Sequence, residues 1–267
     1  MKKYMNIIFI VFLCITFFLV IFGGEKMKLR SVEDIDIYVG AGLGIDKNGE
    51  GNITYRVATT ANAYKQDETT EKVLSIGESS TIGKTREDRQ KKTGKNFFLG
   101  LSKLYIIDEE YARYGIRSFM DINFKNPVVN SNSFIVVCKN RNEEYFKYTN
   151  PGYDNSADYI SDMIKNSVNY NFFSEDYMFK NAVLSIDAEG KNMVSPYIEI
   201  MKDGIKTTGI VVFKKDKLAT ILDMKDTKIM NMLRSNNVKG ILTIQKDSEK
   251  YINYQAESKR KITCRKI

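Results

Sequence analysis

The stretch GESSTIGKT at residues 77–85 has the spacing most suggestive of phosphate chemistry. An apolar run precedes it, and LYIID at residues 104–108 resembles the strand with a terminal acid that holds Mg²⁺ in ATPases. A phosphate loop follows G-x-x-x-x-G-K-[ST], whose spacing lets consecutive N–H groups wrap a phosphate. Here five residues separate Gly77 from Gly83, and Glu78 places a carboxylate where it would repel the phosphate. We therefore interpret the stretch as the entry into a helix; in an ATP-binding membrane protein, the competing interpretation, Lys84→Ala would abolish function.

Two further patterns lie near residue 45. Gly40, Gly42 and Gly44 resemble a dinucleotide fingerprint, but a turn and a strand follow them, so no helix N-terminus is present to bind a phosphate. A bent strand that sterically requires glycine explains them better. The next residues, DKNGEG at 46–51, imitate a calcium loop, but its last position is Val57 and lacks the bidentate Glu. We expect a hairpin turn there.

Histidine is absent from the chain, which excludes Ser-His-Asp and Cys-His catalysis and His-ligated metal sites. The three cysteines stand at 14, 138 and 264 and form no C-x-x-C pair, so a zinc cluster is excluded, while a 138–264 disulfide stays open. We therefore expect no cofactor and no metal.

The net charge is +8, with one basic cluster at Arg86, Arg89, Lys91, Lys92 and Lys95 and another in the last nine residues. Acidic residues are mixed in and no nucleic-acid motif occurs, so we expect no nucleic-acid partner. A solvated face, or weak attraction to anionic lipid head groups, accounts for this charge.

The first 24 residues predict a membrane segment. Lys2 and Lys3 precede an uncharged apolar run of sixteen residues from Ile7 to Phe22. With the two following glycines the run reaches eighteen residues, about 27 Å of helix, which is just enough to span a hydrocarbon core. Ile21 or Phe22 would stand at position −3 of a cleavage site, where small residues are needed, so we expect an uncleaved anchor. Basic residues flank the run on both sides, so charge alone does not fix its orientation.

After the anchor, strand and helix patterns predict a mixed fold. We expect strands at 35–46, 52–60, 71–76, 104–107, 131–139, 195–201, 207–214, 217–222, 240–245 and 251–258, and helices at 79–92, 108–116, 156–170 and 223–235. Strands, then a helix, then strands indicate an α+β fold and not a regular βαβ series. The prediction is an N-terminal anchor (1–24) and two mixed α/β domains (25–190 and 191–267) with largely antiparallel sheets.

The order of these motifs resembles the Ger(x)C family, the C subunit of spore germinant receptors. The motifs that carry the resemblance are IDIYVGAGLGID (35–46), GESSTIGKTRED (77–88), FFLGLSKLYIIDEEYARYGIRSFMDINFKNP (97–127), SNSFIVVCK (131–139) and TTGIVVFKKDKLATIL (207–222). Three positions depart from the family: Gly24 replaces its lipidated Cys, Leu101 its usual His, and Lys125-Asn126 its Arg-Asp pair. The family's third, C-terminal domain of about a hundred residues is also expected to be missing.

The resemblance implies a non-enzymatic subunit on the outer surface of the spore inner membrane, held here by the N-terminal helix. It would work with a multi-spanning A subunit and a transporter-like B subunit in nutrient-triggered germination. The residues expected to serve structure or assembly are Gly42, Gly44, Asp46, Gly100, Lys103, Gly115 and Phe213. A second class stays open: an extracytoplasmic binding protein unrelated to germination, which would have a closed ligand pocket.

Overall fold

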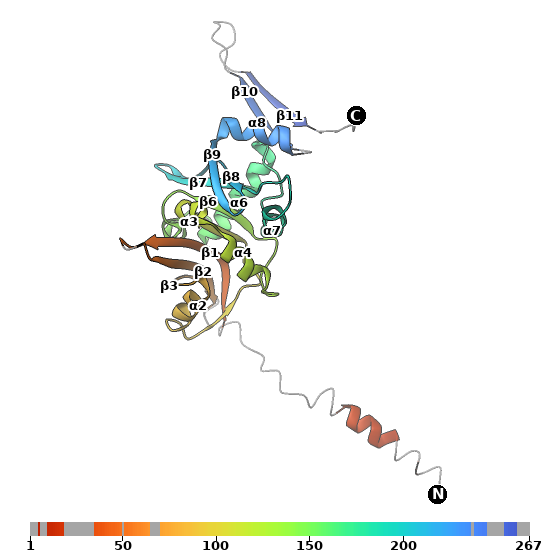
Figure 1. Ribbon diagram of the computed structural model, residues 1–267. Helices are drawn as coiled ribbons and strands as arrows, with labels where there is room; N and C mark the ends of the chain where they lie inside the picture. Colours follow the sequence, from red (N-terminus) through yellow and green to blue (C-terminus); the bar gives the residue numbers. More distant parts are fainter. Residues whose placement is uncertain are drawn as a thin grey trace. The chain divides into compact units, whose positions relative to one another are not determined.

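The computed structural model describes residues 5, 10–18, 35–49, 51–64, 70–235, 238–244 and 254–260 (Figure 1). The chain forms two compact units, residues 1–32 and residues 33–267. Residues 10–18 of the first unit are helical, and most of the expected anchor lies outside the described residues. Among the helices that are described, none has the length and apolar character needed to cross a membrane.

The second unit is built on one large mixed sheet. Along its main path the strands run in the order β3-β2-β1-β5-β6-β7-β8-β9, and β4 pairs with the start of β1. The described strands are β1 (Ile35–Lys47), β2 (Ile53–Tyr64), β3 (Thr70–Ser79), β4 (Asn96–Phe98), β5 (Leu104–Asp108), β6 (Phe134–Cys138), β7 (Val194–Met201), β8 (Gly204–Lys214), β9 (Lys217–Asp223), and the separate hairpin β10 (Val238–Ile244) and β11 (Tyr254–Arg260).

Helices cover both faces of the sheet. In chain order they are α2 (Ile82–Gln90), α3 (Glu109–Tyr114), α4 (Arg117–Phe124), α5 (Asn142–Lys147), α6 (Ser156–Tyr170), α7 (Phe179–Ile186) and α8 (Met224–Arg234). Helices α3, α4 and α7 pack on one face, and α5, α6 and α8 on the other.

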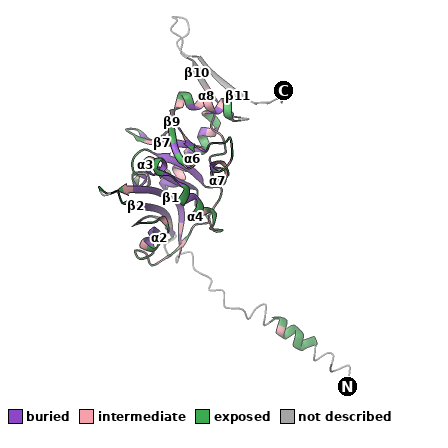
Figure 2. Ribbon diagram, in the orientation of Figure 1, coloured by how far each residue is buried: buried purple, intermediate pink, exposed green. Residues whose placement is uncertain are grey.

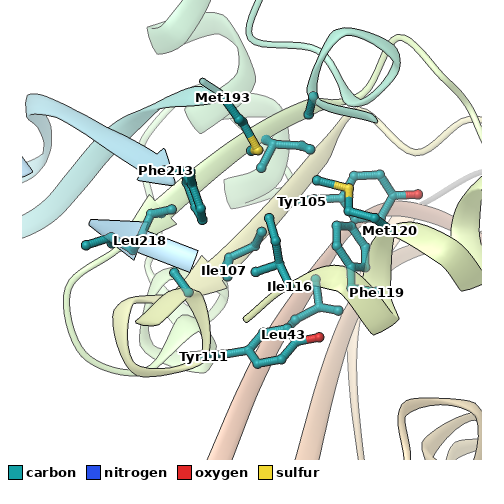
Figure 3. Packing of buried hydrophobic residues seen from close by; sticks show 14 of the residues in the cluster. Leu43, Tyr105, Ile107, Tyr111, Ile116, Phe119, Met120, Met193, Phe213 and Leu218 are labelled. Atoms are coloured by element: carbon teal, nitrogen blue, oxygen red, sulfur yellow. The ribbon is translucent and has the colours of Figure 1, made fainter. Parts of the chain in front are cut away.

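Strand alternation divides the core into two apolar layers. In β5, Tyr105 and Ile107 join the layer under α3, α4 and α7, which Figure 3 shows, while Leu104 and Ile106 face the layer under α5 and α6. Successive side chains of a strand point to opposite faces, so a strand covered on both sides is apolar throughout. Figure 2 shows the central strands buried between these helices.

The local signals in the sequence place the helix ends correctly. Thr81 caps α2 by accepting from the Lys84 N–H at 3.3 Å, and Asp223 caps α8 by accepting from the Asp226 N–H at 2.8 Å. Gly115 ends α3 with φ of +133°, a backbone region that favours glycine. The observed helices agree with those expected at 79–92, 108–116 and 223–235 to within three residues at each end.

The centre of the sheet differs from the expectation. The mixed α/β class and the preponderance of antiparallel pairs agree with it, but β1, β5, β6 and β7 run parallel. Helices connect β5 to β6 and β6 to β7, whereas β2, β3, α2 and β4 lie between β1 and β5 in the chain. The sheet is thus not a regular βαβ series, as expected, but its parallel centre was not predicted. Parallel pairing arises because β5 and β6 are short, fully buried strands whose connections carry α3 to α7, three of which (α4, α5 and α7) the periodicity did not predict. The domain boundary at 190 stays a prediction.

Candidate functional site

Polar side chains gather at the edge where the central parallel strands end. Asp108 and Cys138 are the last residues of β5 and β6, and Asp46 lies near the end of β1. Arg56 faces them from β2, where it pairs in register with Gly44. Because carboxyl ends of parallel strands meet at one edge, residues far apart in sequence converge there.

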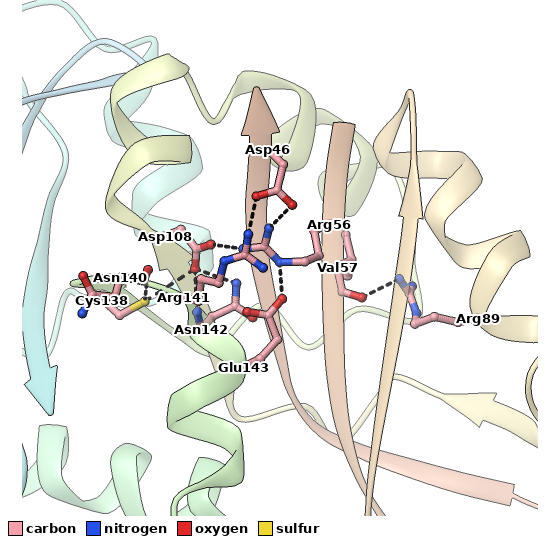
Figure 4. Close-up of polar contacts among 10 residues, drawn as sticks. All are labelled: Asp46, Arg56, Val57, Arg89, Asp108, Cys138, Asn140, Arg141, Asn142 and Glu143. Carbon is pink, nitrogen blue, oxygen red and sulfur yellow. Dashed lines mark hydrogen bonds and ion pairs between the residues drawn. The ribbon is translucent and has the colours of Figure 1, made fainter. Parts of the chain in front are cut away.

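Arg56 is the centre of this cluster (Figure 4). Its Nη1 donates to Asp46 Oδ2 at 2.6 Å, its Nη2 donates to Asp108 Oδ2 at 2.8 Å, and its Nε donates to Glu143 Oε1. The Arg56 side chain is only 3% exposed. We call Arg56, Asp46, Asp108 and Glu143 the Arg56 cluster. One planar guanidinium thus links β1, β2, β5 and α5 through directed, charge-assisted hydrogen bonds.

Asp108 also holds the start of α5. Its Oδ1 accepts from the Asn142 backbone N–H at 2.8 Å and from Asn142 Nδ2 at 2.6 Å. The Cys138 thiol donates to the same oxygen at 3.6 Å. The first N–H groups of a helix have no partner within the helix, so Asp108 satisfies one of them from a neighbouring strand.

Burial shifts the pKa values of two side chains at this edge, Asp108 and Cys138. Burial raises the pKa of Asp108 to about 7, an effect that Asn142 and Arg56 partly offset. The three carboxylates of the Arg56 cluster lie near two guanidiniums, those of Arg56 and Arg141. Arg141, which is exposed, donates to Asp46 Oδ1 at 2.8 Å. Burial likewise raises the pKa of Cys138, so its thiol stays protonated and can donate. Cys138 is free, and Cys264 lies outside the described residues.

The arrangement locks strands together. In the described ranges, no grouping of three or more His, Cys, Asp or Glu side chains could hold a metal ion. The position among the carboxylates that a cation would take is filled by the Arg56 guanidinium (Figure 4). A cleft of about 770 Å³ lies elsewhere, between α7 and α8, where Arg234 Nη2 donates to the Asn192 carbonyl at 2.8 Å.

Two of the glycines predicted to matter sit against the Arg56 cluster. A Cβ at Gly44 would lie 2.1 Å from Asp108 Oδ2 and 2.7 Å from Arg56 Nη2. A Cβ at Gly42 would lie 2.0 Å from Asn142 Oδ1. Real Cβ atoms do not approach so closely, so glycine is required for α5 and the ionic side chains to reach β1. The expectation of a strand that sterically needs glycine is confirmed.

Comparison with known proteins assigns the family. The model described as "Spore germination protein N-terminal domain" matches residues 29–200, and the one described as "Spore germination B3/ GerAC like, C-terminal" matches residues 208–267. The chain belongs to this GerAC-like family. The spore germination protein GerQC of Bacillus cereus is 23% identical over 237 residues, which are 86% of this chain and 62% of that protein. This chain thus spans less than two thirds of that relative, and no solved structure matches.

Within the GerAC-like fold, the remaining predicted residues lie apart from the Arg56 cluster. Lys103 joins the sheet through its N–H to the Val39 carbonyl at 2.7 Å, and its Nζ pairs with Asp158 Oδ1 at 2.5 Å. Phe213 is fully buried in the layer under α3 and α4. Gly115 ends α3, and Gly100 lies under the Phe98 ring. Gly24 lies outside the described residues.

The calcium-like segment is a hairpin turn in the described residues. Lys47 pairs with Ile53 across the antiparallel strands, and the Gly51 N–H donates to the Asn48 carbonyl at 2.9 Å. Gly51 has φ of +80°, which suits glycine. Asp46 points to Arg56 instead of into the turn (Figure 4). Glu50 lies outside the described residues.

The phosphate-like segment has a packing explanation. A Cβ at Gly77 would lie 2.3 Å from the Thr85 carbonyl, so glycine lets α2 lie directly on β3. Lys84 is exposed, as expected of a helix surface. Arg89 corrects the prediction of a solvated basic cluster, because it is buried and its Nη1 donates to the Val57 carbonyl at 3.3 Å. The long aliphatic part of the Arg89 side chain can pack against β2 while its guanidinium forms this hydrogen bond.

The sequence did not reveal Arg56, Asp108 and Glu143 as partners. Asp108 ends the strand that resembles an Mg²⁺-binding element, but in the structure its carboxylate accepts a hydrogen bond from Arg56. A usable signal was Arg56 itself, a charged residue within the otherwise uncharged strand ITYRVATTANAY. Such a residue in a strand that reads as buried needs an acidic partner.

We expect the stability of the domain to depend on pH through Asp108. A carboxyl whose pKa is raised on folding stabilises the fold below about pH 4, and this contribution is lost as pH rises to about 7. The free energy of unfolding of the wild type, minus that of Asp108→Asn, should therefore fall between about pH 4 and pH 7. Urea unfolding at several pH values measures it. A difference that is flat or rises across this range would contradict the raised pKa.

Proposed function

We propose that this protein is the membrane-anchored C subunit of a spore germinant receptor and acts without catalysis. The observation that carries the proposal is the match of two germination-family models, in order, to residues 29–200 and 208–267. The relative GerQC, named a spore germination protein, supports it. The proposed place is the outer face of the spore inner membrane, with the apolar N-terminal run as the anchor.

The Arg56 cluster supports a structural role for the domain in such a receptor. Arg56 engages all three carboxylates, so the cluster holds β1, β2, β5 and α5 in one arrangement. A rigid sheet of this kind offers fixed surfaces to partner subunits. We propose A- and B-type receptor subunits as those partners.

Co-purification tests the proposal. A tagged copy is recovered from detergent-solubilised spore inner membrane, and accompanying proteins are identified by mass spectrometry. A- and B-type subunits should accompany the full chain but not a matched control in which residues 1–34 alone carry the tag. Recovery of the chain alone, from membranes in which intact receptors are detected, would contradict the proposal.

A further inference from the structure

The edge of the sheet opposite the Arg56 cluster is formed by the starts of the parallel strands. Segment 91–103 contains β4 and leads into β5, and segment 123–133 leads from the end of α4 into β6. The two segments touch, since Asn130 Nδ2 donates to the Ser102 carbonyl at 2.8 Å and Ser133 Oγ donates to the same oxygen at 2.7 Å. β1 begins at this edge as well, because Ile35 pairs with Asn96.

Large apolar side chains protrude from these segments. Phe98 is 41% exposed, Leu101 55%, Phe124 69% and Val128 49%. Phe98 lies over Gly100, where an added Cβ would come within 2.9 Å of the ring. Leu101 directly precedes Ser102, which binds Asn130, so the apolar residues of both segments gather on one surface. Clustered exposed apolar side chains mark an interaction site more often than single ones do.

The same two segments are basic. Together they contain five lysines and no Asp or Glu: Lys91, Lys92, Lys95, Lys103 and Lys125. Lys91, Lys92, Lys103 and Lys125 are exposed, and Lys95 is partly exposed. Nearby acids neutralise part of this charge, since Asp88 pairs with Lys92 at 2.8 Å and Asp158 pairs with Lys103. Asp121 on α4 is exposed, and Asp36 is buried. The surface therefore combines apolar side chains with an excess of lysine.

We propose that this surface, Phe98, Leu101, Phe124 and Val128 with the five lysines, rests on an anionic lipid bilayer. The inference depends on the proposed anchor. Twelve residues, 23–34, connect the apolar run to β1, and they span about 40 Å at most. The domain is thus tethered to the proposed anchor through the edge at which β1 begins. Apolar side chains enter the interface while lysines bind anionic head groups, and two weak signals together give stable contact.

The sequence contains no tryptophan, so a single introduced tryptophan is the only source of tryptophan fluorescence. The full chain is reconstituted in vesicles with a single reporter, Phe98→Trp or Phe124→Trp, and quenching by brominated lipid is measured with and without anionic lipid. Leu233→Trp is the matched control, because Leu233 is 63% exposed on α8, which lies near the other end of the domain (Figure 1).

Both reporters should be quenched at least twofold more than the Leu233→Trp control in anionic vesicles. Replacing the five lysines with Gln, or using neutral lipid, should reduce that quenching to the control level. Equal quenching at all three sites, or quenching that ignores lipid charge, would overturn the proposal.

This test separates the surface from the proposed function. The vesicles contain no A or B subunit, so failure of receptor assembly does not affect the result. A chain that inserts into vesicles but leaves its reporters unquenched overturns the surface alone. A chain that fails to join vesicles at all contradicts the anchor, and with it both proposals.

Discussion

Arg56→Met should destabilise the domain by about 3–5 kcal/mol, the largest loss expected from a single substitution in the Arg56 cluster. The change keeps much of the side-chain volume but leaves Asp108 and Glu143 buried without a cation, and their side chains are only 6% and 7% exposed. Arg56→Lys should lose nearly as much, because one ammonium cannot reproduce the planar fork that reaches three carboxylates. Denaturant unfolding followed by circular dichroism measures both.

Arg141→Met is the matched control for this result. Its side chain is 58% exposed and pairs only with Asp46 among the carboxylates of the cluster. Pairs at the surface contribute about 0–1 kcal/mol, so this variant should unfold close to the wild type. Equal losses for Arg56→Met and Arg141→Met would show that the buried cluster does not stabilise the fold.

Gly44→Ala should cost about 2–3 kcal/mol or prevent folding. The new methyl group would occupy the space of Asp108 Oδ2 and press on Arg56 Nη2, so both must leave their hydrogen bonds. Gly42→Ala should have a similar effect through Asn142. Thermal unfolding of the purified domain in the same buffer measures these losses.

Gly83→Ala provides the control of opposite sign. Gly83 lies in α2, and nothing lies within 4 Å of an added Cβ. Alanine favours the helix, so this variant should be neutral or more stable by up to about 1 kcal/mol. If Gly44→Ala behaved like Gly83→Ala, the close contacts around β1 would not limit the residue at this position.

Local signals in the sequence predicted much of the fold. Thr81, Gly115 and Asp223 each act on a backbone group within four residues, so their caps follow from sequence alone. The same holds for the hairpin of β1 and β2, where the turn residues dictate the connection. The glycines of β1 were also recognised as sterically required, although their contacts were not.

The Arg56 cluster could not be predicted in the same way. Arg56 is 52 residues from Asp108 and 87 residues from Glu143, so only the sheet order brings them together. That order depends on β5 and β6 pairing in parallel, and short apolar strands such as LYIID carry no signal for the direction of their neighbours. The missed helices α5 and α7 are short, so their periodicity was too brief to detect.

The central claim, that the chain is a working receptor subunit, is tested most directly by quantifying A- and B-type subunits that co-purify with the tagged chain from spore inner membrane. The account predicts both subunits in molar amounts comparable to that of the chain, and far above those recovered with the tagged residues 1–34. Amounts no higher than with that control, from membranes that contain intact receptors, would contradict it.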